Sequence, residues 1–211
     1  MGTTDQALLA GMVVDPDEQN EWFEVPAHIR IRERLAGKRT PTYRKRLQKL
    51  FLDRIGFTGT QVGMTTAQRY RVSSLLAFHT PGEVHHGDCV GADADFDALC
   101  HTVSKIQYGD FVIHLHPWNG PDSKRAHCER HTPGQGLARH TTILHHPAPP
   151  LDRNRVIVNA VQGMIATPKE SLEEIRSGTW ATIRYALQTR RWLWVIYPTG
   201  AVAVVPGLVP E

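Results

Sequence analysis

The chain has 211 residues, 41% of them hydrophobic and 21% charged, with a formal net charge of +3 at pH 7. This length allows one sizeable α/β domain plus a shorter segment, and the composition is ordinary for a globular protein. No run approaches the roughly 18–20 apolar residues that span a membrane, and the first ten residues lack the basic residues of a secretion signal. Three cysteines are too few for a disulfide framework. We therefore expect a cytoplasmic protein with reduced thiols.

The first 54 residues differ in composition from the rest of the chain. Residues 1–27 contain six acidic residues and no Lys or Arg, and interrupting prolines predict coil with at most a short helix. Residues 28–54 contain ten Lys or Arg against two acidic residues, and two helical segments are predicted there. We expect residues 1–54 to form an arm that is first acidic, then basic and helical. Its basic part would either contact nucleic acid or an acidic partner, or be neutralised by the acidic N-terminus.

Short apolar segments alternate with helix-forming segments from residue 55 onward. Strands are predicted over 55–60, 83–87, 111–117, 164–168 and 192–198, with further candidates at 141–144 and 201–205. Such alternation indicates a parallel, doubly wound sheet with helices on both faces. We therefore predict that residues 55–211 form an α/β domain around a mainly parallel sheet of about five strands.

Three loops and a pair of arginines are predicted to meet outside the carboxyl ends of the strands, where doubly wound sheets bind ligands. The candidate ligand contacts are Gly59, Thr60, Gln61 and Gly63 in the first loop, Gly87, Gly91 and Asp93 in the second, Ser177, Gly178 and Thr179 in the third, and Arg153 and Arg155. Where a strand turns into a helix, free backbone N–H groups and the helix dipole favour an anion. Neither G-x-G-x-x-G nor G-K-[ST] is present, so we predict a phosphate site without a standard cofactor motif.

Other polar and aromatic residues leave alternatives open. Asp88 follows a predicted strand, where its carboxylate would either hold a ribose hydroxyl or form the turn. Trp118 would either stack a base or cover an apolar patch. Histidines between positions 114 and 146, together with Cys128, are ligand types that zinc prefers. Because no C-x-x-C or H-E-x-x-H spacing accompanies them, we predict no metal site and no cofactor.

Two parts of the sequence resemble a known family. The stretch Leu151–Ile157 contains R-N-R, and Ser177–Thr179 reads S-G-T, which is similar to the paired R-N-R and S-G-S/T motifs of the bacterial DNA-processing protein A family. The segment His86–Asp93 resembles the S-G-x-A-x-G-x-D turn of that family. Residues 55–198 as a whole resemble the SMF/DprA–LOG (SLOG) superfamily of Rossmann-like nucleotide binders. This superfamily also contains the "lonely guy" phosphoribohydrolases and sensor domains for signalling nucleotides.

The resemblance implies a Rossmann-like sheet, a phosphate-binding crevice and a homo-oligomer. The ligand contacts that it implies are Arg153, Asn154, Ser177, Gly178 and Thr179. The hydrolases of the superfamily carry P-G-G-x-G-T-x-x-E, and Thr182 stands here at the position of their Glu. Cleavage by that route would need another carboxylate, for which Asp88 is the tentative catalytic candidate. The winged-helix domain of the DNA-processing proteins is not expected, because the chain ends soon after the last predicted strand.

Three hypotheses for the function remain. The first is the binding of a nucleotide or another phosphate-bearing small molecule. The second is an N-glycosidase or phosphoribohydrolase that acts on nucleoside monophosphates, with a carboxylate stabilising the developing positive charge. The third is single-stranded nucleic-acid binding by the basic arm and the arginine-lined edge of the sheet, which would weaken steeply with salt. No membrane partner is expected.

Overall fold

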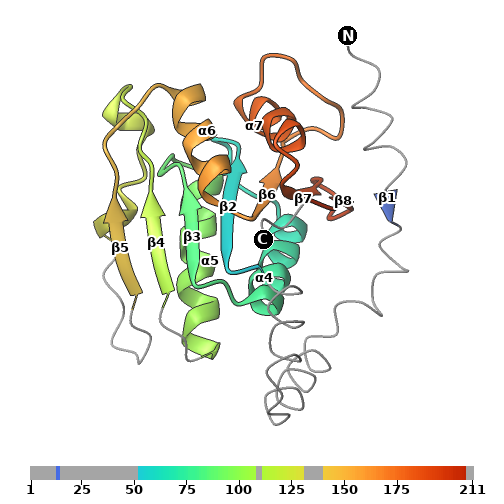
Figure 1. Ribbon diagram of the computed structural model, residues 1–211, viewed down its shortest axis with the longest axis horizontal. Coiled ribbons are helices and arrows are strands. Elements are labelled where there is room, and N and C mark those ends of the chain that lie inside the picture. The colour runs from blue at the N-terminus through green and yellow to red at the C-terminus, as the bar shows by residue number, and fades with distance from the viewer. Residues whose placement is uncertain (1–12, 15–51, 108–110, 131–139, 208–211) are drawn as a thin grey trace.

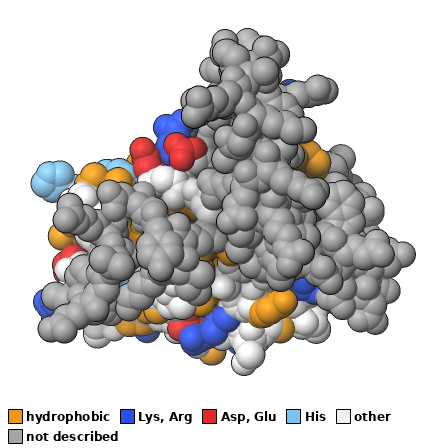
Figure 2. Space-filling model, turned by 90° about the horizontal axis from the view of Figure 1, so that it is seen from below, with side chains coloured by type: hydrophobic (Ala, Val, Ile, Leu, Met, Phe, Trp, Pro, Cys, Tyr) orange, Lys and Arg blue, Asp and Glu red, His pale blue; other side chains and the backbone are white. Residues whose placement is uncertain are grey.

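The computed structural model describes residues 13–14, 52–107, 111–130 and 140–207 (Figure 1 and Figure 2). The predicted N-terminal arm therefore lies almost entirely outside the described residues. Within them, the elements are β1 (Val13–Val14), β2 (Arg54–Gly59), α4 (Thr66–His79), β3 (Glu83–His86), α5 (Ala92–Gln107), β4 (Phe111–Leu115), β5 (His140–Leu144), α6 (Pro150–Ala160), β6 (Gly163–Thr167), α7 (Gly178–Gln188), β7 (Trp192–Ile196) and β8 (Val202–Val205). Two 3-10 turns, Asp122–Lys124 and Cys128–Arg130, lie between β4 and β5.

The strands form one sheet in the order β1-β8-β7-β6-β2-β3-β4-β5. All neighbours from β7 to β5 pair in parallel, while β8 is antiparallel to β7 and to β1. The prediction of a doubly wound, mainly parallel α/β fold is confirmed. The described sheet is wider than the predicted five strands because both further candidates form strands, as β5 and β8, and β1 pairs with β8.

The two-residue strand β1 lies within the acidic segment, for which coil with at most a short helix was predicted. Val13 and Val14 pair with Val202 and Ala203 of β8. Two residues carry no periodicity that a sequence pattern can reveal, but β-branched side chains suit the free edge of an antiparallel strand. This pairing places β1 beside β8 at one edge of the described sheet (Figure 1).

The sheet separates two apolar layers. Consecutive residues of a strand point to opposite faces, and in β6 Ile165 packs in one core while Met164 and Ala166 pack in the other. The first core contains residues of α4 and α5, and the second contains residues of α6 and α7. No described helix is long and apolar enough to cross a membrane.

The order of the strands places a topological switch point between β2 and β6. From β2 the chain moves through α4 to β3 and then to β4 on one side, and after β5 it returns through α6 to β6 on the other side of β2. The connections that leave β2 and β6 therefore run in opposite directions. Such a divergence opens a crevice at the carboxyl ends of the two strands, here near Gly59 and Thr167.

Candidate functional site

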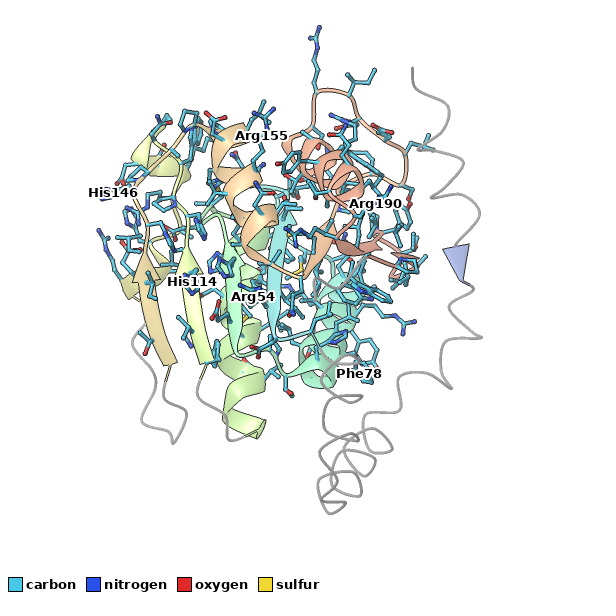
Figure 3. The ribbon with its side chains drawn as sticks, viewed as in Figure 1. Arg54, Phe78, His114, His146, Arg155 and Arg190 are labelled. Atoms are coloured by element: carbon cyan, nitrogen blue, oxygen red, sulfur yellow. The ribbon has the colours of Figure 1, made fainter. Side chains whose placement is uncertain are left out.

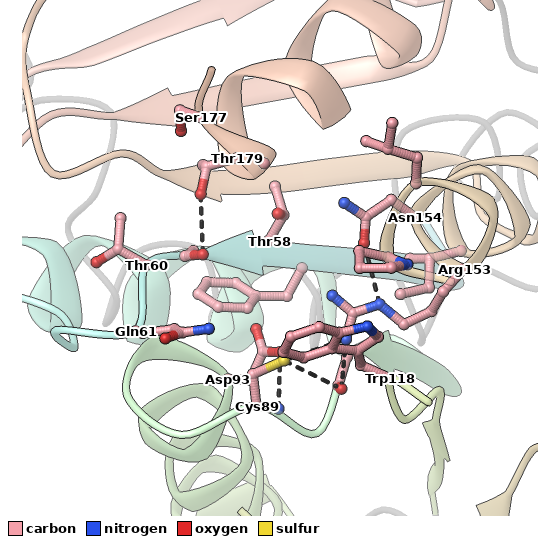
Figure 4. Close-up of a pocket in the computed structure, with 17 residues that line it drawn as sticks. Thr58, Thr60, Gln61, Cys89, Asp93, Trp118, Arg153, Asn154, Ser177 and Thr179 are labelled. Carbon is pink, nitrogen blue, oxygen red and sulfur yellow. Dashed lines mark hydrogen bonds between the residues drawn. The ribbon is translucent and has the colours of Figure 1, made fainter. Parts of the chain in front are cut away.

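A cavity of about 360 Å³ lies at the switch point (Figure 4). Seventeen residues line it, and they come from β2, the β3–α5 loop, Trp118, α6 and the start of α7. This volume is within the range of about 300–1,000 Å³ that is usual for small-molecule sites.

The cavity brings together most of the residues that were predicted as ligand contacts. Those that line it are Gly59, Thr60, Gln61, Gly87, Asp93, Arg153, Asn154, Ser177, Gly178 and Thr179. Those that do not line it are Gly63, Asp88, Gly91 and Arg155. Loops separated by more than a hundred residues therefore meet where parallel strands end.

Helix α7 points its N-terminus at the cavity. Ser177 is the N-cap, and its hydroxyl accepts a hydrogen bond from the Trp180 N–H at 3.4 Å. The Thr179 hydroxyl donates to the Gly59 carbonyl at 2.8 Å, which holds the helix start against the end of β2. The first N–H groups of a helix have no intrahelical acceptor, and this first turn contains no acidic residue. The helix start therefore offers hydrogen-bond donors and a positive partial charge to an anion.

Arg153 projects from α6 toward the β3–α5 loop. Its Nη1 donates to the Gly87 carbonyl at 2.6 Å and lies 3.2 Å from Cys89 Sγ, while its Nε donates to Asn154 Oδ1 at 3.1 Å. A Cβ at Gly87 would collide with the guanidinium, so a glycine is needed there for this close approach. Among the described residues, no hydrogen bond engages Nη2. Arg153 is thus held rigidly with part of its guanidinium left for a ligand.

Asn154 connects α6 to α7. Its Nδ2 donates to Thr182 Oγ1 at 2.8 Å, and the Thr182 hydroxyl in turn donates to the Gly178 carbonyl at 2.9 Å. Both side chains are buried. Asn154 therefore fixes the start of α7 relative to Arg153, in addition to lining the cavity.

Asp93 is the acidic residue of the cavity. Its side chain is buried, and Oδ2 accepts a hydrogen bond from the Cys89 N–H at 3.1 Å. Burial raises the pKa of the Asp93 carboxyl above its ordinary value, although His86 and Arg153 act against this shift. Among the 17 described residues that line the cavity, Asp93 is the only one with a carboxylate side chain and Arg153 the only Lys or Arg. The cavity thus contains one carboxyl group and one guanidinium group. The carboxyl can carry a proton or accept a hydrogen bond from a hydroxyl group of a ligand.

Asp88 is turned away from the cavity. Its carboxylate is fully buried, with Oδ2 accepting from Arg125 Nε at 2.7 Å and Oδ1 from the Cys128 N–H at 2.9 Å. The backbone has a positive φ of 52°, which Asp tolerates in turns. Its position supports the turn alternative, in which it anchors the segment after β4, and does not support the tentative catalytic role.

The remaining predicted contacts also have structural positions. Gly91 adopts a positive φ of 88°, and a Cβ there would collide with the Gln61 backbone, so this glycine lets the first two loops touch. Gly63 likewise has a positive φ. Arg155 is exposed, lies 3.6 Å from Asp152, and lines a separate groove of about 170 Å³ between α6 and α7. Of the two arginines in the R-N-R motif, only Arg153 reaches the cavity.

Some cavity residues were not predicted. Cys89 lies between the two glycines of the second loop, and its position there was the available signal. Leu151 and Ile157 lie on the same side of α6 as Arg153 and Asn154, which a helical spacing could have indicated. The Trp118 indole also lines the cavity, and its ring lies over Gly120, where a Cβ would collide with it. An aromatic surface is therefore part of the cavity lining (Figure 4).

Comparisons of this sequence with protein-family models and with curated proteins give no match.

Proposed function

We propose that the cavity at the switch point binds a nucleotide or a nucleotide-derived ligand. The observation that carries this proposal is the convergence of the α7 N-terminus, Arg153 and Trp118 on one cavity of about 360 Å³. A phosphate would accept hydrogen bonds from the first N–H groups of α7, at the end of the cavity where Ser177 lies. In Figure 4 Trp118 lies across the cavity from Ser177 and Thr179, where its indole would stack on a base.

Two further groups would contact the middle of such a ligand. The free part of the Arg153 guanidinium supplies positive charge, and guanidinium groups bind phosphate oxygens well. The Asp93 carboxyl would accept a hydrogen bond from a ribose hydroxyl. The resemblance to the SLOG superfamily supports the same assignment, since the residues that match its motifs at 87–93, 153–154 and 177–179 include seven that line this cavity, namely Gly87, Asp93, Arg153, Asn154, Ser177, Gly178 and Thr179.

Gly178 offers a sharp test of phosphate binding. A Cβ at this position would meet no heavy atom within 4 Å, so a larger side chain fits without rearrangement. In Gly178→Asp the new carboxylate lies in the first turn of α7, where it stabilises the helix by about 0.3–1 kcal/mol but repels a phosphate. We expect at least a tenfold loss of nucleotide affinity without a lower melting temperature, measured by calorimetry over a panel of mono-, di- and cyclic nucleotides.

Gly178→Ala is the matched control for this test. It adds a Cβ without a charge, so nucleotide affinity should stay within about threefold of the wild type. No binding of any nucleotide by the wild-type chain, or equal affinities of the Asp and Ala variants, would contradict the proposal.

A second candidate function rests on Asp93. Thr182 stands where the superfamily's hydrolases carry Glu, and its hydroxyl is engaged by Asn154, so that position supplies no carboxylate. Asp93 instead places a buried carboxyl in the cavity, with Arg153 and His86 favouring its ionised form. In a hydrolysis of nucleoside monophosphates it would stabilise the positive charge that develops on the sugar as water replaces the base. Release of free base by the wild-type chain but not by Asp93→Asn, followed by chromatography, would select this candidate.

The proposal extends to the setting of the protein. A cytoplasmic location is supported by the sparse cysteines and by the described helices, none of which could span a membrane. Assembly into a homo-oligomer is supported by the resemblance and by exposed apolar residues, among them Leu172 and Ile175, which are 79% and 85% exposed. Single-stranded nucleic-acid binding depends on the basic arm, which lies outside the described residues. Light scattering and a salt-dependent retention assay would test these points.

A further inference from the structure

Four histidines gather on one face of the sheet, away from the cavity. His85 lies on β3 and His114 on β4, where the parallel pairing places them directly side by side. His116 and His145 follow β4 and β5, and the His145 N–H donates to the Leu115 carbonyl, which continues the parallel pairing. His114 and His116 are two residues apart, so they point to the same face. Ring centroids are 4.1 Å apart both for His85 and His114 and for His116 and His145.

The four rings form two hydrogen-bonded pairs. His85 Nδ1 lies 3.1 Å from His116 Nε2, and His114 Nδ1 lies 3.0 Å from His145 Nε2. In both pairs a strand histidine uses Nδ1 and its partner uses Nε2. If each Nδ1 carries the proton, His116 and His145 accept, and the Nε2 atoms of His85 and His114 are left with free lone pairs.

Both Nε2 atoms lie near the same carboxylate oxygen of Glu83. Glu83 Oε2 lies 3.7 Å from His85 Nε2 and 3.9 Å from His114 Nε2, too far for a hydrogen bond. His85 Nε2 is fully buried and has no hydrogen-bond partner in the described structure. A buried polar atom without a partner is destabilising and calls for an explanation.

We propose that Glu83, His85 and His114 bind a divalent transition-metal ion of the Zn²⁺ type. The three ligand atoms all lie within 4.8 Å of one another. In a tetrahedral zinc site, bonds of about 2.0–2.1 Å place ligand atoms about 3.3 Å apart, so the two gaps from Glu83 Oε2 close by about 0.4 and about 0.6 Å. The His85 and His114 rings are stacked with 3° between their planes, so the more exposed His114 ring turns on binding to point its lone pair at the ion. Two imidazoles and one carboxylate leave the fourth position for water, a ligand set that zinc uses in open sites.

The surrounding residues suit this role. Metal-binding histidines almost always donate their second N–H to an outer partner, and His116 and His145 are placed to accept from His85 and His114. The Glu83 side chain is 41% exposed, which gives the ion a path from solvent.

Other charged and titratable groups lie close to the three ligands. Arg54 on β2 pairs in register with Glu83 and adds positive charge that opposes the ion, while Glu83 adds the compensating negative charge. His146 follows His145 at the edge of the molecule, beyond the end of β5 (Figure 3).

A second group of similar residues provides a contrast. His86, Asp97 and Cys128 lie on the opposite face and also have ligand atoms within 4.8 Å of one another. There, however, His86 Nδ1 accepts from the Asp88 N–H, so its Nε2 carries the proton and faces Asp97 Oδ1 at 3.3 Å. That histidine has no free lone pair, and the group is fully buried. We assign the metal only to the Glu83 site.

Zinc binding by the untagged full chain tests this proposal and does not depend on the nucleotide cavity. After treatment with EDTA, the wild-type chain is titrated with Zn²⁺ in a calorimeter, and Co²⁺ is used as a second probe because four-coordinate Co²⁺ absorbs strongly in the visible range. Loss of one bound ion, or a loss of affinity greater than tenfold, is expected in His114→Gln and in Glu83→Gln. Both altered side chains are partly exposed, so these variants should fold.

Two further variants separate direct ligands from their partners. His116→Gln should bind Zn²⁺ about 10–100-fold more weakly, as is usual when the outer partner of a ligand is lost. His146→Gln is the control, because it removes an exposed neighbouring histidine, and it should bind as the wild type does. Zn²⁺ binding that is absent in the wild type, or is unchanged in both His114→Gln and Glu83→Gln, would overturn the proposal.

Discussion

The cavity at the switch point and the histidine cluster are both built from buried polar groups, but in different ways. The cavity is made by loops and helix ends at the carboxyl edge of the sheet. The cluster of His85, His114, His116 and His145 is made by strand pairing on one face of the sheet. The two regions meet at His116, whose carbonyl lies 3.4 Å from Arg153 Nη1 while its ring contacts His85.

This difference shows two ways in which a parallel sheet assembles a site. At the strand ends, each loop contributes through its own backbone geometry, so the contributing loops carry glycines and capping residues. On the face, a side chain contributes only through the register of neighbouring strands, and no local motif marks it. The predictions below separate the two regions by changing one contact at a time.

The largest effect is expected for Asp88→Ala, which removes the carboxylate that holds the β3–α5 loop to the segment after β4. Removing this carboxylate leaves the Arg125 guanidinium and the buried Cys128 N–H without their acceptor. Breaking a buried ion pair from one side costs about 3–5 kcal/mol. Urea denaturation should show a decrease of that size in the free energy of unfolding. Asp122→Ala, which removes an ion pair from an 81% exposed side chain, should change stability by less than about 1 kcal/mol.

The next effect distinguishes the two arginines of the R-N-R motif. Arg153→Ala should weaken nucleotide binding about 10–100-fold, because hydrogen bonds to charged groups contribute about 1.5–3 kcal/mol. Arg155→Ala should leave binding unchanged, since this side chain lies in the other groove. Calorimetry with the tightest nucleotide of the panel measures both. Equal losses of affinity in the two variants would show that the ligand contacts both the cavity and the groove between α6 and α7.

The histidine cluster should make stability depend on pH. Burial lowers the pKa of His116 to about 2 and that of His85 to about 3, whereas in the unfolded chain both rings protonate near pH 6.5. Below that pH the unfolded state binds more protons, so the free energy of unfolding falls by up to about 1.4 kcal/mol per pH unit for each ring. Urea titrations between about pH 7.5 and 5 should show this fall.

Replacing one histidine of the cluster distinguishes its contribution to the pH dependence of stability from the contributions of other titrating groups. His116→Gln removes one titration and should make the pH dependence shallower by up to about 1.4 kcal/mol per pH unit. His79 is buried elsewhere, its pKa is lowered to about 4, and it contributes a slope of the same sign that the variant keeps. An unchanged slope in His116→Gln would place the pH dependence outside the cluster.

The smallest effect is expected at the start of α7. Thr179→Val removes the hydrogen bond to the Gly59 carbonyl and should lower stability by about 1 kcal/mol, while nucleotide binding weakens as the helix start loosens. Thr102→Val is the matched control, because its exposed hydroxyl also donates to a carbonyl, that of Ala98, but within one helix. If both variants lose equal stability and neither affects binding, the Thr179 contact does not position the site.

The sequence by itself determined the fold class and most of the cavity. Alternating strands and helices predict a parallel sheet, and a parallel sheet brings its carboxyl ends to one edge, so loops at Gly59, Gly87 and Ser177 had to meet there. These features depend on local patterns and on the handedness of strand connections, both of which the chain carries in order. The predicted function of the cavity remains a proposal.

The tertiary structure decided which individual side chains lie together. Only the packing of the β3–α5 loop shows that Asp93 faces the cavity while Asp88 is held by Arg125. Only the strand register places His85 beside His114. The direction of a side chain in a turn depends on one backbone angle, and the contact between two strands depends on register, and neither leaves a periodic trace in the sequence.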